Sequence, residues 1–161
     1  MDLKKSHKIG FSFGLTSGVI TTLGLLIGLA TATNSRLVAI GGVLTIAIAD
    51  ALSDSFGIHV SEEARGKSTS ADVLEATIST FLYKFLTAVS FLIPIVFLSL
   101  NYAVIASIVW GFFLISLLSF YIAKTENTNY RKVILEHILI ATIVIVVSYY
   151  VGLFVSSFFV V

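Results

Sequence analysis

The chain of 161 residues contains no cysteine, a single proline and few charged residues. Without cysteine it has no disulfide framework, no thiolate metal site and no redox pair. Charged residues make up 12% of the chain and hydrophobic residues 57%, with a mean hydropathy of +1.03. A soluble domain of this length could not bury so much apolar surface, because small domains need far more polar covering. The composition therefore indicates a protein whose solvent is lipid.

Five apolar runs are each long enough to cross roughly 30 Å of bilayer hydrocarbon, which takes about 20 helical residues. Their apolar residues are continuous rather than alternating, which argues against membrane β-strands. The first run is too long for a cleavable signal and is followed by further spans. We therefore predict an all-α polytopic membrane protein that forms one domain over residues 1–161. The five helices are expected near 9–32, 37–60, 73–99, 103–123 and 133–158.

Basic residues outside the spans lie almost entirely on one side of the predicted bilayer. Only Arg36 falls on the other side. Because loops rich in lysine and arginine stay in the cytoplasm, we expect a cytoplasmic N-terminus and an external C-terminus. The short loops and the lack of a targeting extension favour a prokaryotic plasma membrane. The basic residues of the cytoplasmic side are Lys4, Lys5, Lys8, Arg65, Lys67, Lys124, Arg131 and Lys132.

The first run carries a stripe of small residues. Its members, alternately four and three residues apart, are Gly10, Gly14, Ser17, Thr21, Gly24 and Gly28. This spacing keeps them on one helical face, and small residues let membrane helices approach closely. We predict tight helix packing along the stripe, including contact with a second copy in a homodimer. An alternative interpretation is that the stripe lines a polar pathway, with the hydroxyls of Ser17 and Thr21 as cation ligands.

The second run carries two aspartates, Asp50 and Asp54, in the segment AIADALSDSFGIHVSEEA. They share a helical face, and an aspartate near the middle of a membrane helix costs about 2.5–3.5 kcal/mol on insertion scales. Lys84 is the one basic residue well inside a span, at about the depth of Asp50. One interpretation is a buried ion pair between Asp50 and Lys84 that fixes the helix register. Because one lysine cannot satisfy two carboxylates, we expect Asp54 to bind a passing cation or a proton.

Further polar residues lie near the ends of the spans. Glu62 and Glu63 either attract cations to a cytoplasmic entrance or belong to a solvated loop. His59 is expected at the membrane interface, on roughly the opposite face from Asp50. We expect Pro94 to loosen the outer half of the third span and to free a carbonyl group. No motif for nucleophilic catalysis, phosphate binding or zinc binding is present, so we expect neither an enzyme nor a bound cofactor.

The segments FGLTSGVITTLG (13–24) and ALSDSFGIHVS (51–61) resemble motifs of the vacuolar iron transporter family of divalent-metal transporters. The first is similar to Phe-Gly, two residues, Asp-Gly, two residues, Thr-Thr, one residue, Gly. The second is similar to Ala-Leu-Ser-Met, two residues, Gly-Glu-Tyr-Val-Ser. The segments FLIPIVF and SYYVGLF also occupy places where the family has comparable sequence. The resemblance covers nearly the whole chain. It implies a five-helix homodimer whose first two helices line a route that exchanges Fe²⁺ or Mn²⁺ for protons.

The chain departs from this family's pattern at the metal ligands. The family's first-helix aspartate corresponds to Ser17, its second-helix methionine to Asp54, and its glutamate after glycine to Ile58. A long cytoplasmic metal-binding insertion is replaced by the twelve residues 61–72. The candidate ligands are therefore hard oxygen donors, which suit Mn²⁺, Mg²⁺ or Ca²⁺ at least as well as Fe²⁺. This set consists of Ser17, Thr21, Asp50 and Asp54.

From these observations we expect a dimeric, proton-coupled membrane transporter of divalent cations, with Fe²⁺ or Mn²⁺ as the transported ion. Its expected partners are the lipid bilayer and a second copy bound through the first helix, and no nucleic acid. Lys84 is expected to act as a counter-charge that occupies the site when no cation is present. The rival prediction is a non-transporting scaffold or assembly protein of the same fold. The missing first-helix aspartate and the charge of Lys84 favour that rival.

Overall fold

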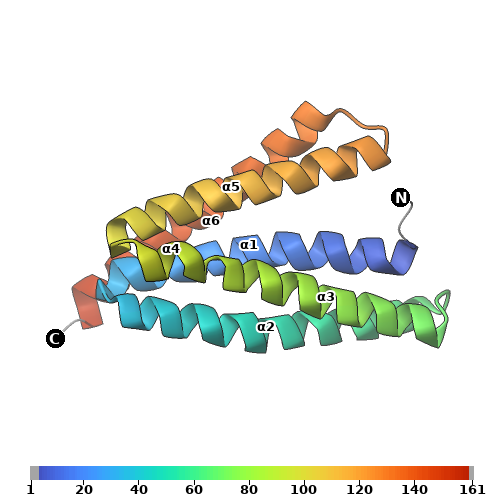
Figure 1. The fold of residues 1–161 in the computed structure, drawn as a ribbon, viewed down its shortest axis with the longest axis horizontal. Coiled ribbons are helices and arrows are strands. Elements are labelled where there is room, and N and C mark those ends of the chain that lie inside the picture. The colour runs from blue at the N-terminus through green and yellow to red at the C-terminus, as the bar shows by residue number, and fades with distance from the viewer. Residues whose placement is uncertain (1–3, 160–161) are drawn as a thin grey trace.

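The computed structural model describes residues 4–159, which are helical along almost their whole length (Figure 1). With α3 and α4 taken together, five helices are long and apolar enough to cross a membrane. The predicted all-α architecture with five candidate spans is therefore confirmed. The helices are α1 (Lys5–Thr33), α2 (Arg36–Arg65), α3 (Ser70–Ser90), α4 (Leu92–Phe97), α5 (Leu100–Thr125) and α6 (Tyr130–Phe159).

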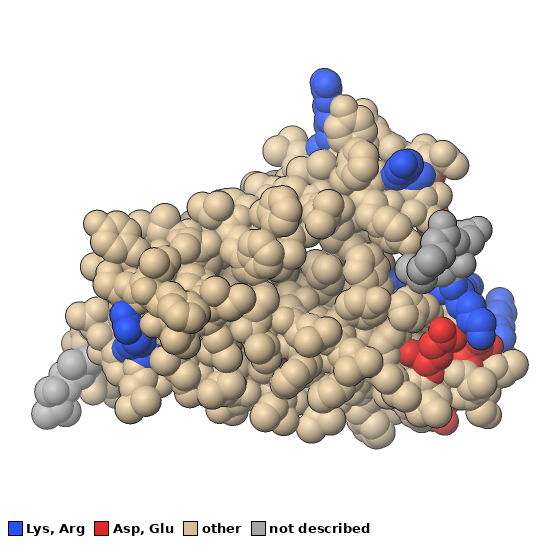
Figure 2. All heavy atoms as spheres, viewed as in Figure 1, with Lys and Arg blue, Asp and Glu red and all other residues tan. Residues whose placement is uncertain are grey.

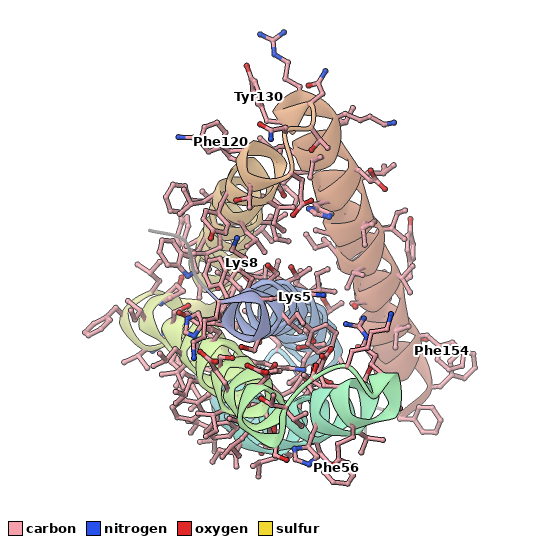
Figure 3. The ribbon with its side chains drawn as sticks, turned by 90° about the vertical axis from the view of Figure 1, so that its right-hand side faces the viewer. Lys5, Lys8, Phe56, Phe120, Tyr130 and Phe154 are labelled. Atoms are coloured by element: carbon pink, nitrogen blue, oxygen red, sulfur yellow. The ribbon has the colours of Figure 1, made fainter. Side chains whose placement is uncertain are left out.

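Helix α1 lies at the centre of the bundle. Viewed along the bundle, α2 and α3 pack on one side of it and the α5–α6 hairpin on the other (Figure 3). Buried Val19 and Leu23 of α1 meet Ile115 of α5 and Ala141 of α6 in one apolar cluster. In the space-filling view, charged side chains gather at the ends of the molecule and leave an uncharged middle (Figure 2). This distribution is typical of helices that cross hydrocarbon.

Glycines determine how closely α1 approaches its neighbours. A Cβ atom on Gly14 would lie 2.7 Å from the Thr80 carbonyl oxygen of α3. Towards the other end of α1, a Cβ atom on Gly152 of α6 would lie 2.7 Å from the Gly28 carbonyl oxygen. The small-residue stripe of α1 therefore packs tightly within the chain, against α3 in its N-terminal half and against α6 in its C-terminal half. Its contact with a second copy stays a prediction.

The third span is interrupted rather than continuous over 73–99. Helix α3 ends at Ser90 and α4 begins at Leu92. Pro94 explains the interruption, because it has no N–H group to donate and its ring crowds the preceding turn. The indole Nε1 of Trp110 on α5 donates to Ser90 Oγ at 2.9 Å, beside the break. The expected loosening at Pro94 thus takes the form of a helix break.

The connection between the second and third spans is shorter than the expected twelve residues 61–72. Gly66, with a φ of 62°, ends α2 in the left-handed conformation that glycine adopts without strain. Thr69 and Asp72 then form a capping box that starts α3. Glu62 is therefore helical and does not belong to a solvated loop. The physical reason is that two strong helix-end signals stand only three residues apart.

Candidate functional site

A charged cluster lies between α1, α2 and α3, near the middle of each span. Lys84 Nζ lies 2.6 Å from Asp50 Oδ2, donates to Ser17 Oγ at 2.9 Å and also contacts Asp54 Oδ2. The Ser17 hydroxyl donates to Asp54 Oδ2 at 2.6 Å. These contacts join three helices that are distant in sequence. We call Ser17, Asp50, Asp54 and Lys84 the Lys84 cluster.

Lys84 is shared between the two carboxylates. The ion pair between Asp50 and Lys84 is present, as one interpretation of the sequence proposed. The premise that one lysine cannot satisfy both carboxylates is wrong, because Lys84 contacts both and Ser17 also donates to Asp54. All of these contacts use Oδ2 atoms, and Asp50 Oδ2 forms the ion pair without a hydrogen bond of good geometry. Among residues 4–159, Oδ1 of each aspartate accepts no hydrogen bond. Binding of a passing cation or a proton by Asp54 stays a prediction.

Burial differs between the lysine and its two partners. The Lys84 side chain is 1% exposed, whereas those of Asp50 and Asp54 are 28% and 23% exposed. A buried ammonium group without a counter-charge costs several kcal/mol, so Lys84 depends on the carboxylates. With all three groups ionised, two carboxylates and one ammonium leave one net negative charge. The cluster therefore combines a buried cation with a partly accessible acidic edge.

Helical spacing and a glycine assemble this cluster. Asp50 and Asp54 are four residues apart and lie on one face of α2. A Cβ atom on Gly14 of α1 would lie 3.1 Å from the backbone nitrogen of Lys84. The close approach of α1 and α3 brings the Lys84 side chain within reach of Ser17 and of α2. The cluster thus depends on the small residues of α1 as well as on its charged members.

A groove of about 560 Å³ between α1, α2 and α6 begins one helical turn from the cluster; its lining includes Thr21, Gly24, Gly28, Ile46 and Ser148. Thr21 follows Ser17 by one turn on α1, and Ile46 precedes Asp50 by one turn on α2, so the groove and the cluster share a face of each helix. The Thr21 hydroxyl donates to the Ser17 carbonyl oxygen at 2.8 Å and contacts no side chain of the cluster. We call this cleft the α1–α2–α6 groove.

The two glutamates proposed for a cation entrance lie at the end of α2, away from the cluster. Glu62 is 6% exposed and accepts hydrogen bonds from Arg65 Nη1 at 2.8 Å and from Ser68 Oγ at 3.0 Å. Glu63 is exposed and lies 3.4 Å from His59 Nε2. Glu62 is therefore already neutralised by a neighbour, and a role in attracting cations stays a prediction.

A second polar cluster, which the sequence analysis missed, joins the start of α1 to α3. Ser6 Oγ donates to Glu75 Oε2 at 2.7 Å, and His7 Nδ1 lies 3.9 Å from Glu75 Oε1. The other ring nitrogen of His7 lies 3.0 Å from the Tyr83 hydroxyl oxygen. Residues so far apart in sequence show no periodic pattern. The one available signal was an acid, Glu75, inside the predicted span 73–99.

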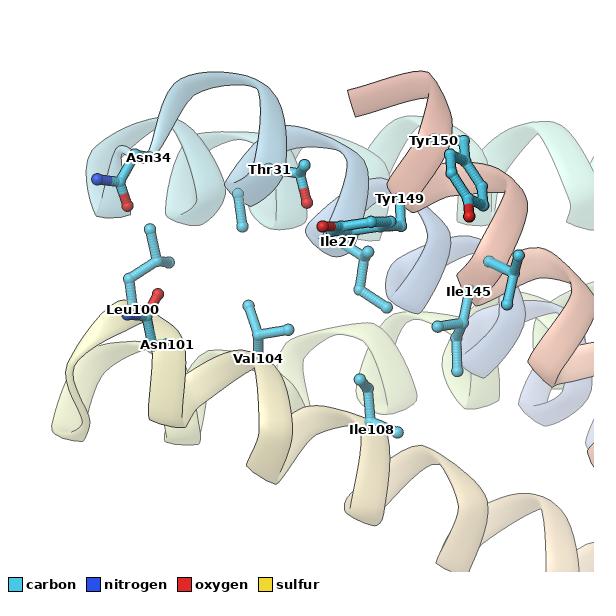
Figure 4. Close-up of a pocket in the computed structure, with 12 residues that line it drawn as sticks. Ile27, Thr31, Asn34, Leu100, Asn101, Val104, Ile108, Ile145, Tyr149 and Tyr150 are labelled. Atoms are coloured by element: carbon cyan, nitrogen blue, oxygen red, sulfur yellow. The ribbon is translucent and has the colours of Figure 1, made fainter. Parts of the chain in front are cut away.

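An open cavity of about 640 Å³ lies between α1, α5 and α6, near the C-terminal end of α1 (Figure 4). The amides of Asn34 and Asn101 and the ring of Tyr149 line it together with aliphatic residues such as Ile27 and Val104. None of its lining side chains is charged. The cavity therefore offers no counter-charge to a cation, and the Lys84 cluster is the better candidate site.

Neither local geometry nor known proteins identify a preformed metal centre. Within residues 4–159, no group of three or more His, Cys, Asp or Glu side chains is arranged to hold a metal ion. Comparison of the chain with family models, curated protein sequences and solved structures gives no match. The resemblance to vacuolar iron transporters therefore depends on the two quoted motifs, and the function must be argued from the Lys84 cluster itself.

Proposed function

We propose that the protein is a membrane transporter of divalent cations and that the Lys84 cluster binds the transported ion. The observation that carries this proposal is a pair of mid-span aspartates, Asp50 and Asp54, each partly exposed and each with one oxygen that accepts no hydrogen bond within residues 4–159. Acids inside membrane spans are costly and often mark ion pathways. The two carboxylates carry two negative charges, which one divalent cation neutralises completely once the Lys84 ammonium group has moved away.

Lys84 acts in this proposal as a counter-charge that the cation displaces. In the cation-free state its ammonium group holds the Oδ2 atoms of Asp50 and Asp54. A cation that enters through the α1–α2–α6 groove meets the Oδ1 atoms and the Ser17 hydroxyl. The displaced ammonium must then reach water or give up its proton, because an unpaired buried charge costs several kcal/mol. Only the second step releases a proton, so proton coupling in this proposal requires the Lys84 ammonium group to give its proton to water when the cation binds.

A second copy of the chain is proposed to cover the α1–α2–α6 groove. Asp50 and Asp54 are each about a quarter exposed, so in a single chain their edges would lie next to lipid. Gly24 and Gly28 line the groove, and small residues suit the close approach of another membrane helix. A homodimer would therefore exclude lipid from the carboxylates. We further propose a cytoplasmic N-terminus, because basic residues concentrate on the side of the bundle where the N-terminus lies. The short loops favour a prokaryotic plasma membrane.

The ligand atoms favour hard cations. Carboxylate and hydroxyl oxygens suit Mn²⁺, Mg²⁺ and Ca²⁺ as well as Fe²⁺, and the cluster contains no thioether or imidazole. We therefore propose Mn²⁺ or Fe²⁺ as the physiological ion, following the family resemblance, with Mg²⁺ and Ca²⁺ as the ions to compare.

Uptake by purified protein in liposomes that contain a metal-sensitive dye tests the proposal. Mn²⁺, Fe²⁺, Co²⁺, Mg²⁺ and Ca²⁺ are added outside, and a pH-sensitive dye in parallel liposomes reports proton movement. We expect uptake of at least one divalent cation, and we expect Asp54→Asn to abolish it. Glu136→Gln is a matched control, since it makes the same carboxyl-to-amide change at an exposed position of α6 outside the cluster. Uptake that survives Asp54→Asn would remove the site assignment.

A scaffold function remains the second candidate, and the shared Lys84 contacts favour it. Lys84 and Ser17 already hold both carboxylates, so the cluster could serve only to fix α1, α2 and α3 together. Metal affinity separates the two functions. A transporter binds a divalent cation with an affinity that changes in Lys84→Met, whereas a scaffold binds none in either form and only loses stability in that variant.

A further inference from the structure

A cationic cavity lies at the end of the bundle where α1 begins and α2 passes to α3. Its volume is about 310 Å³. Charged side chains gather at this end of the molecule in the space-filling view, and the end-on view shows Lys5 beside the start of α1 (Figures 2 and 3). The cavity is lined by four basic side chains (Lys4, Lys5, Arg65 and Lys67) and by two acidic ones (Glu62 and Asp72).

Both acids are already engaged in the wall of the cavity. Glu62 is almost fully buried and accepts from Arg65 and from Ser68. Asp72 accepts from the backbone nitrogen and the hydroxyl of Thr69 in the capping box. These contacts hold the connection between α2 and α3 in place. Both carboxylates are therefore already bonded to groups of the protein. Among residues 4–159, neither of these acids forms an ion pair with Lys5 or Lys67.

Two bases of the cavity have no acidic partner within the described part of the chain. Lys4 lies 3.9 Å from Glu75 and Arg65 bonds to Glu62, whereas Lys5 and Lys67 have no ion-pair or hydrogen-bond partner among residues 4–159. Lys5 comes from the start of α1 and Lys67 from the α2–α3 connection, so the fold brings them to one concave site. Surplus positive charge in a concavity attracts anions more strongly than the same charge on a flat surface.

We propose that this cavity binds a phosphate group, with Lys5 and Lys67 as its main ligands. Lysine binds phosphate as a mobile point charge and does not need the fixed geometry of a phosphate loop. Ile9 also lines the cavity and marks the start of the apolar part of α1, which places the site at headgroup depth if α1 spans the membrane. The phosphate of an anionic phospholipid is therefore the first source to test, and free phosphate is the second. This inference does not depend on the proposed transport function.

Binding to the purified full-length protein tests the proposal with a matched pair of variants. Native mass spectrometry measures the affinity for phosphatidylglycerol and for phosphatidylcholine, and calorimetry measures binding of inorganic phosphate. We expect phosphatidylglycerol to bind more tightly than phosphatidylcholine. Lys5→Gln/Lys67→Gln should weaken its binding about 30-fold, as expected for the loss of two lysine contacts to an anionic headgroup. Lys124→Gln/Lys132→Gln removes the same charge from exposed positions around the α5–α6 connection and should change the affinity less than about threefold.

Each outcome decides the proposal. If inorganic phosphate binds with the same dependence on Lys5 and Lys67 and the lipid preference is absent, the site is a phosphate site that takes its ligand from solution. Equal weakening by both double variants would mean diffuse attraction to the basic face and would overturn the proposal. Binding of neither phosphatidylglycerol nor inorganic phosphate would overturn it as well. All four substituted lysines are exposed, so both double variants are expected to fold.

Discussion

The layer of α1, α2 and α3 and the hairpin of α5 and α6 are held together by different means. Helix α1 has ten buried residues and contacts the buried Lys84, whereas the described part of α6 buries only Ala141 and Gly152. The layer carries a charged cluster at its centre. The contacts between α5 and α6 are mostly apolar and include one hydrogen-bonded pair, Ser119 and His137.

This difference indicates which part of the molecule is rigid. In lipid, apolar side chains gain little by leaving their surroundings, so helices associate through close packing and polar contacts. The layer has both close packing and polar contacts, and the hairpin has less of each. We infer that the layer is a fixed platform for the Lys84 cluster. If the protein transports cations as proposed, α6, one wall of the α1–α2–α6 groove, is the element whose movement would open or close access to the cluster.

Replacing Lys84 with methionine is expected to cause the largest loss in the free energy of unfolding. The substitution leaves Asp50 and Asp54 without a counter-charge, and removing one partner of a buried ion pair costs about 3–5 kcal/mol. Circular dichroism during unfolding in mixed detergent micelles measures the loss of free energy. A loss below about 1 kcal/mol would show that the cluster does not hold the layer together.

A charge-free version of the cluster separates the cost of unpaired charge from the loss of packing. In the triple variant Lys84→Met/Asp50→Asn/Asp54→Asn no charge remains, and replacing a complete buried ion pair is often close to neutral. We expect the triple variant to recover most of the stability that Lys84→Met loses. Failure to recover would mean that the length and packing of the lysine side chain matter more than its charge.

Adding a methyl group at two glycines compares the layer with the hairpin directly. In Gly14→Ala the new Cβ would lie 2.7 Å from the Thr80 carbonyl oxygen, and in Gly152→Ala it would lie 2.7 Å from the Gly28 carbonyl oxygen. Overpacking of this kind costs about 1–3 kcal/mol. We expect Gly14→Ala to fall in that range and Gly152→Ala to cost less, because the less buried α6 can shift away from α1. The same unfolding measurement determines both values.

Gly57→Ala serves as the control for these two variants. Apart from the nearby backbone of its own helix, no atom of residues 4–159 lies within 4 Å of a Cβ at Gly57, so the change adds helix propensity without a clash. Its stability should equal or slightly exceed that of the unmodified chain. Equal losses in Gly14→Ala and Gly152→Ala would show that the hairpin is as rigid as the layer, and the contrast between the two regions would fail.

Much of the bundle could be predicted from the sequence because its signals are local. Continuous apolar runs predict spans, and counting residues from the shared α2–α3 connection places Lys84 at the depth of Asp50, which it contacts. The break in the third span follows from Pro94. These inferences need only the length of a helix and the chemistry of single residues.

The features that could not be predicted depend on how helices approach one another. The reach of Lys84 to both Asp54 and Ser17 follows from the close contact between α1 and α3, which no pattern within one helix specifies. The burial of Glu62 depends on Ser68 of the next connection. The presence of Lys5 and Lys67 in one cavity likewise requires the start of α1 to lie beside the α2–α3 connection.

Removing the polar contact between α5 and α6 is expected to cause the smallest loss in the free energy of unfolding. Ser119 Oγ of α5 lies 2.7 Å from His137 Nδ1 of α6, and Ser119→Ala removes this hydrogen bond. Interhelical hydrogen bonds within membranes contribute about 0.6 kcal/mol on average, so we expect a loss of that size in the same unfolding measurement. Ser157→Ala is the matched control and should be neutral, because among residues 4–159 the Ser157 hydroxyl bonds only to the carbonyl oxygen of Phe154 in its own helix. If Ser119→Ala cost as much as Gly14→Ala, the hairpin would be held by a polar contact of its own. Movement of α6 over the groove would then not be the route of access in the proposed transport function, and a cation would have to reach Asp50 between the helices of the layer instead.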